Sequence, residues 1–136
     1  MRAIASKRLI ALCAVYMVAS LIHFAHNAEF LVDYPNLPQT WTRAGVYLGW
    51  VGMTVVGAIG LFLVTRGFRV VGLLLIAVYS ILGMDSLGHY VVAPISAHTV
   101  AMNLTIMLEV STAALVFVEV ARRGIGLARD VWRRQP

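Results

Sequence analysis

The chain has 136 residues, of which 60% are hydrophobic and only 12% are charged. Ordinary soluble domains carry about 25% charged residues, so this composition excludes a soluble domain and predicts a membrane protein. The formal net charge of +5 does not indicate nucleic-acid binding, because the basic residues lie between apolar stretches rather than in one patch.

A membrane-spanning helix needs about 20 predominantly apolar residues. Four stretches meet this requirement, at residues 9–28, 44–64, 70–92 and 97–121. We therefore predict an all-α membrane protein formed by one four-transmembrane-helix bundle, followed by a cytoplasmic interfacial tail at residues 122–136. In number and length of spans, the layout resembles that of several small bacterial four-span families, DoxX-like proteins among them.

The basic residues predict the orientation. All of them except Arg43 precede the first predicted span, connect the second to the third, or follow the fourth. These segments lie on one side of the membrane, and the positive-inside rule assigns that side to the cytoplasm. We therefore expect a multi-pass protein of the cell's inner (plasma) membrane with both termini in the cytoplasm.

The first span also has the basic start and apolar centre of a signal peptide. The sequence HFAHNA that ends it lacks a small residue three positions before a cleavage after Ala28. We expect the span to be retained. Cleavage, the alternative, would remove His23 and His26 from the mature protein.

All four histidines are predicted on the extracytoplasmic side. His23 and His26 end the first span, His89 ends the third, and His98 begins the fourth. His23 and His26 are three residues apart, and Asp85 and His89 are four apart, so each pair shares a helix face. Ionisable groups inside a membrane are candidates for function.

Imidazoles and a carboxylate at these spacings suit Zn, Cu or Fe. We therefore predict a transition-metal site on the extracytoplasmic side. Its predicted ligands are His23, His26, Asp85 and His89, with His98 as a fifth candidate. The side chains expected to support these ligands are Asn27, Glu29 and Asn103.

Three alternatives remain open for this cluster. A b-type haem, or a quinone in a redox membrane anchor, would use one histidine from the first span and one from the third. An enzyme acting on a lipophilic or quinone-like molecule would use Asp85 and Glu109 as candidate catalytic acid–base groups. In a structural subunit of a membrane complex, the polar groups would only hydrogen-bond one another and hold the loops in place.

Glu109 lies about twelve residues into the fourth predicted span, which corresponds to about 18 Å and places it near mid-membrane. An ionised, unpaired carboxylate there would cost several kcal/mol. We therefore expect Glu109 to be protonated, to face water, or to be partnered by Asn103, Thr105 or Tyr79.

The second predicted span is rich in glycine and contains a G-x-x-x-G pattern at Gly45 and Gly49. Small residues let membrane helices approach closely, so we expect packing within the bundle, with homo-oligomer formation as the alternative. The loop before this span carries Tyr34 and Trp41. These aromatic residues are expected either in an interfacial belt or in a lid over the histidines.

Overall fold

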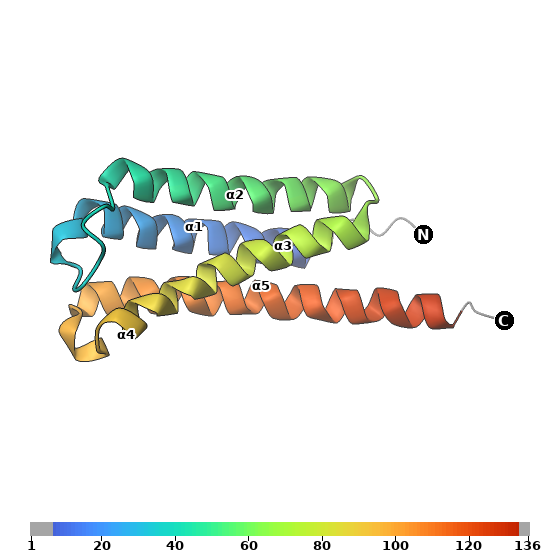
Figure 1. Cartoon of the computed structure of the whole chain (residues 1–136). Helices are drawn as coiled ribbons and strands as arrows, with labels where there is room; N and C mark the ends of the chain where they lie inside the picture. Colours follow the sequence, from blue (N-terminus) through green and yellow to red (C-terminus); the bar gives the residue numbers. More distant parts are fainter. Residues whose placement is uncertain (1–6, 134–136) are drawn as a thin grey trace.

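The structure is a computed structural model that describes residues 7–133. Its four long helices run alternately in opposite directions (Figure 1), and no strand occurs within the described range. They are α1 (Lys7–Glu29), α2 (Arg43–Thr65), α3 (Arg69–Met84) and α5 (Val100–Trp132). A 3-10 turn (Asp85–Gly88) and the short helix α4 (His89–Val92) extend α3.

Four stretches of the described chain are long and apolar enough to cross a membrane: α1, α2, α3 with its extension to Val92, and α5. Large apolar side chains cover the outside of the bundle, among them Val18, Leu48, Leu74 and Leu115. Water would penalise so much exposed apolar surface, whereas lipid does not. The predicted fold class, a four-helix transmembrane bundle, is confirmed.

Each helix has two neighbours in the bundle. α1 packs against α2 and α5, and α3 packs against the same two helices. In Figure 1, α3 runs obliquely from the end of α2 toward the start of α5. Where α2 meets the beginning of α3, a Cβ atom built on Gly60 would lie 2.9 Å from the carbonyl oxygen of Gly72. Glycine at both positions therefore permits this close approach.

The two ends of the bundle differ in composition. The histidine end consists of the end of α1, the start of α2, the turn Asp85–Gly88 with α4, and the start of α5. The arginine end consists of the start of α1, the α2–α3 connection and the last turns of α5. The α2–α3 connection contains Gly67 with φ of 95°, a left-handed conformation that glycine adopts without steric cost.

The helix bounds differ from the predicted spans at two places. The third span is not one continuous α-helix, because Asp85–Gly88 forms a 3-10 turn. Asp, Ser and Gly favour turns over helix interiors, which accounts for this break. The fourth helix begins at Val100, after the Thr99 side chain caps its first turn, and not at residue 97.

Residues 122–132, predicted as part of a separate interfacial tail, continue α5 without a break. The segment contains no proline that would end the helix. The whole of α5 has 33 residues and is about 50 Å long at 1.5 Å per residue. A bilayer core is about 30 Å thick, so the last turns of α5 extend beyond it. Their contact with a membrane surface stays a prediction.

We expect Gly72→Ala to destabilise the bundle, because its new Cβ atom would lie 2.7 Å from the carbonyl oxygen of Gly60. Overpacking of this kind costs about 1–3 kcal/mol. The matched control is Gly52→Ala, since nothing lies within 4 Å of a Cβ atom built there. Thermal unfolding in mild detergent measures both, and an unchanged midpoint for Gly72→Ala would contradict the close helix contact.

Candidate functional site

The carboxyl group of Glu109 lies in the interior of the bundle, with no exposed surface. It projects from α5 toward His23 of α1, which is 2% exposed. The Nε2 atom of His23 is 3.7 Å from Oε2 of Glu109. The other ring nitrogen, Nδ1, is 3.3 Å from the hydroxyl of Thr105, one turn earlier on α5. Two residues of α5 therefore orient the His23 ring.

The 3-10 turn after α3 brings a hydroxyl to the same carboxyl group. The Ser86 hydroxyl donates a hydrogen bond of 2.5 Å to Oε2 of Glu109. The other oxygen, Oε1, has no hydrogen-bond partner of good geometry in the described part of the chain. Glu109 is therefore held by groups from α1, Ser20 among them, and from the turn.

These partners differ from the ones expected from the sequence. Of the three residues proposed to partner Glu109, Thr105 bonds His23 instead. Asn103 accepts a hydrogen bond from the Tyr90 hydroxyl, 2.9 Å away. Sequence reasoning did not identify Ser86, although it directly follows a candidate residue, Asp85.

A second polar group surrounds His89, nearer the surface of the histidine end. The amide nitrogen of Asn27 is 3.2 Å from Nε2 of His89. The His89 ring centroid lies 5.4 Å from that of His23, 5.0 Å from that of Tyr34 and 6.1 Å from that of His98. Three of the four histidines thus form a chain of neighbouring rings, as their predicted placement on one side implied.

His26, in the last turn of α1, contacts the loop that follows rather than this group. Its Nδ1 atom is 2.9 Å from the Tyr34 hydroxyl, and its ring packs on Phe30 at a centroid distance of 4.7 Å. Tyr34 is buried, and burial raises the pKa of its hydroxyl from 10.0 to about 12. His26 and Tyr34 therefore join the end of α1 to the loop that follows it.

The other two residues expected to support a metal site connect segments of the fold. Glu29 accepts a hydrogen bond from the Tyr47 hydroxyl at 2.8 Å and pairs with Arg43 at 2.6 Å, which links α1 to α2 at the surface. The Asn103 amide donates to the carbonyl oxygens of Ile95 and His98, at 3.2 and 3.3 Å. Of the three, only Asn27 contacts the imidazole of a predicted ligand, whereas Asn103 contacts the backbone of His98.

The described residues contain no group of three or more His, Cys, Asp or Glu side chains that could hold a metal ion. His23 and His89 are neighbours, but the Nε2 atom of His23 faces Glu109 and that of His89 faces Asn27. His23 has a polar group near each ring nitrogen, whereas Nδ1 of His89 is buried without a hydrogen-bond partner in the described part of the chain. The predicted metal site and the haem alternative gain no support from this arrangement and stay predictions.

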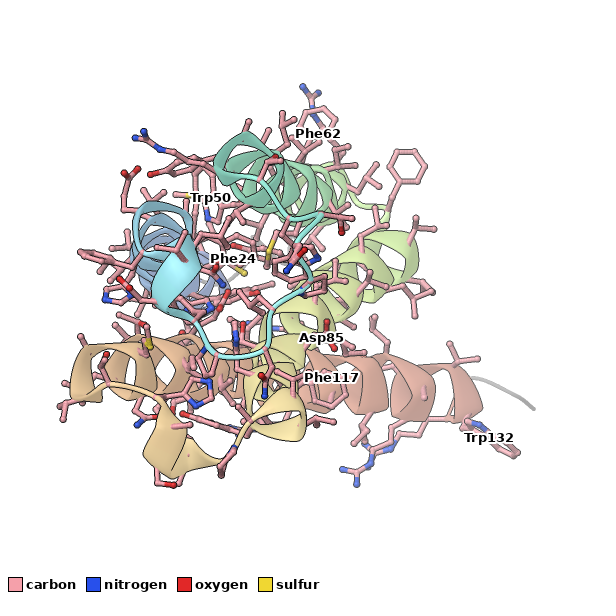
Figure 2. All side chains as sticks on the ribbon, turned by 60° about the vertical axis from the view of Figure 1, so that its left-hand side comes forward. Phe24, Trp50, Phe62, Asp85, Phe117 and Trp132 are labelled. Carbon is pink, nitrogen blue, oxygen red and sulfur yellow. The ribbon has the colours of Figure 1, made fainter. Side chains whose placement is uncertain are left out.

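A pocket of about 600 Å³ opens at the histidine end, between α1, α2 and the α3–α4 segment. Its polar lining includes His23, Asn27, Asp85, Ser86 and His89. The remaining lining residues are Phe24, Leu37, Pro38, Thr40, Trp41, Thr42, Gly45, Val46, Gly49, Leu82, Gly88 and Val92. Figure 2 looks toward this end and shows Phe24 on the inner side of α1 and Asp85 at the end of α3.

The glycines of the G-x-x-x-G pattern line this pocket. A Cβ atom built on Gly49 would meet only the Phe24 ring, at 3.7 Å, whereas one built on Gly57 would lie 2.5 Å from the Tyr79 ring. Gly57 thus serves helix packing, as expected, while Gly45 and Gly49 leave space. Trp41 lines the same space, which agrees with the interpretation of its loop as a lid.

Comparison of the chain with protein-family models, with curated proteins and with solved structures returned no match. The likeness to DoxX-like proteins is therefore one of span number and length only. A function has to be argued from the geometry of the histidine end.

We expect the buried Tyr34 hydroxyl to couple stability to alkaline pH. Its pKa is about 12 in the folded chain against 10.0 when free, so its contribution to stability is complete below pH 10 and is lost as pH rises toward 12. The tyrosinate absorbance of the parent minus that of Tyr34→Phe should titrate near pH 12. A midpoint near 10 would contradict burial of this hydroxyl.

Proposed function

We propose that the pocket at the histidine end binds a small lipophilic molecule, whose polar end exchanges a proton with Ser86, Glu109 and His23. The observation that carries this proposal is the position of Ser86. Ser86 lines the pocket, and its hydroxyl donates to the Glu109 carboxyl. One hydroxyl therefore connects a space of ligand size with a buried acid.

The size and lining of the pocket support a ligand with an apolar body. Small-molecule sites commonly enclose about 300–1,000 Å³, with mostly apolar walls and a few convergent polar groups. This pocket has about 600 Å³, with Phe24, Val46 and Leu82 among its apolar walls. The polar groups come from α1 and from the α3–α4 segment, so a ligand would direct its polar end toward them.

The buried groups support proton exchange as the chemistry. A carboxyl group next to an imidazole forms a pair in which either member can donate or accept a proton. Here the two are 3.7 Å apart, and the Ser86 hydroxyl contacts the carboxyl group from the pocket side. His23 itself lines the pocket, so it can also reach a bound ligand directly.

We further propose that the histidine end faces away from the cytoplasm in the cell's inner (plasma) membrane. Within residues 7–133, every lysine and arginine except Arg43 belongs to segments at the opposite end, which supports this orientation by the positive-inside rule. A lipophilic ligand would then enter from the outer half of the bilayer or from its surface.

Filling the pocket should abolish binding. Gly49→Leu places an isobutyl group beside Phe24 in the pocket, whereas Gly52→Leu places the same group on an exposed part of α2 where nothing lies within 4 Å. The probe is decyl-benzoquinone, and the readout is quenching of Trp41 fluorescence in a variant with Trp50 and Trp132 replaced by phenylalanine.

We expect saturable quenching in the parent and in Gly52→Leu, and an affinity at least about ten-fold lower in Gly49→Leu, which corresponds to about 1.4 kcal/mol. Equal affinities of the two leucine variants would overturn the pocket assignment. Non-saturable quenching in the parent would do the same.

Ligand binding should also change the Glu109 carboxyl group. In infrared difference spectra on addition of decyl-benzoquinone, we expect a carboxyl band that is absent in Glu109→Gln and shifted in Ser86→Ala. Ser80→Ala is the control, because Ser80 is a buried serine of α3 whose hydroxyl bonds the Ala77 carbonyl oxygen, at 2.8 Å. Spectra of Ser86→Ala and Ser80→Ala that match each other would refute the connection through Ser86.

A further inference from the structure

We propose that the ligand of this pocket is a lipophilic cation, an amphiphilic amine, and that Asp85 is its counter-ion. This inference rests on the proposed function and adds the charge of the ligand to it. It follows from the charges at the pocket, from the free carboxylate among them, and from the aromatic rings of the lining.

The pocket is acidic on balance. Asp85 lines it, and Glu109 lies behind Ser86. None of its lining residues is Lys or Arg. Arg43 is the only basic residue of the described chain that the sequence places at the histidine end, and it is paired with Glu29 at 2.6 Å. An anionic head group would therefore meet the Asp85 carboxylate and no lysine or arginine; the nitrogen bases of the lining are the imidazoles of His23 and His89.

The Asp85 side chain has no hydrogen-bond or ion-pair partner within residues 7–133. It is exposed, it lines the pocket, and its charge acts on the neighbouring His89. The other acids of the helical core are engaged: Glu109 with Ser86, and Glu119 with Arg8 and Arg123 at the arginine end. A free carboxylate beside an apolar pocket favours a positively charged partner from outside the chain.

Two aromatic rings complete the cation site. Phe24 forms part of the pocket wall, and Trp41 contributes from the loop. The faces of such rings attract ammonium groups, most strongly when water is excluded. Asp85 and Ser86 belong to the same turn and both line the pocket, so an amine held by Asp85 lies near the hydroxyl that contacts Glu109. The cation site and the proposed proton exchange are thus adjacent.

The test compares three amphiphiles with the same chain: dodecyltrimethylammonium, dodecanol and dodecanesulfonate. Each is added in dodecyl maltoside at low mole fraction, and its affinity is measured by displacement of decyl-benzoquinone from the parent protein. We expect the affinity to decrease in the order cation, alcohol, sulfonate. Asp85→Asn should lower the affinity for the cation roughly ten-fold and leave the affinity for the alcohol unchanged.

The control is Asp33→Asn, which removes the same charge from the same end of the bundle at a residue outside the pocket lining. An equal effect of the two substitutions, or sulfonate binding as tight as that of the cation, would overturn the counter-ion role of Asp85. Alcohol binding that survives Asp85→Asn but is lost in Gly49→Leu would leave the lipophilic pocket standing, so the two proposals fail separately.

Discussion

A carboxyl group near the middle of a membrane-spanning bundle requires donors around it, because lipid supplies none. Glu109 imposes this requirement, and the histidine end is organised to meet it. α1 contributes His23, and the helix of the third span ends at Met84, so that a 3-10 turn can direct Ser86 toward the carboxyl group. The break in α3, which the turn-forming residues cause, thus places Ser86 beside Glu109.

The glycines of α2 have two different roles. Two of them set the distance between α2 and α3, and two line the pocket. Gly57 and Gly60 meet the Tyr79 ring and the Gly72 backbone so closely that no side chain would fit. Gly45 and Gly49, which lie nearer the start of α2 and the histidine end, line the pocket. Glycine therefore allows close helix packing at one end of α2 and leaves space for a pocket at the other end. A pocket can form beside the buried acid without loss of the helix contact that supports it.

Span number, the gathering of the histidines at one end and the mid-span position of Glu109 could be predicted from the sequence. The directions of the side chains could not. Residues three apart share a helix face, but His23 and His26 face different neighbours, because packing against α5 and the loop sets the rotation of α1. Ser86 could not be found either, since a lone serine in an apolar span gives no signal until the turn around it is known.

Below Glu109, toward the arginine end, the core of the bundle is filled by apolar and aromatic side chains. Ala113 and Val116 continue the buried face of α5, and Tyr16, Cys13 and Leu9 fill the space from α1. The polar groups around Glu109 are therefore connected to a pocket at the histidine end, and apolar packing lies on the other side of them. A proton that Glu109 exchanged with the pocket would enter and leave on the same side of the membrane, so the exchange would carry no net charge across the bilayer.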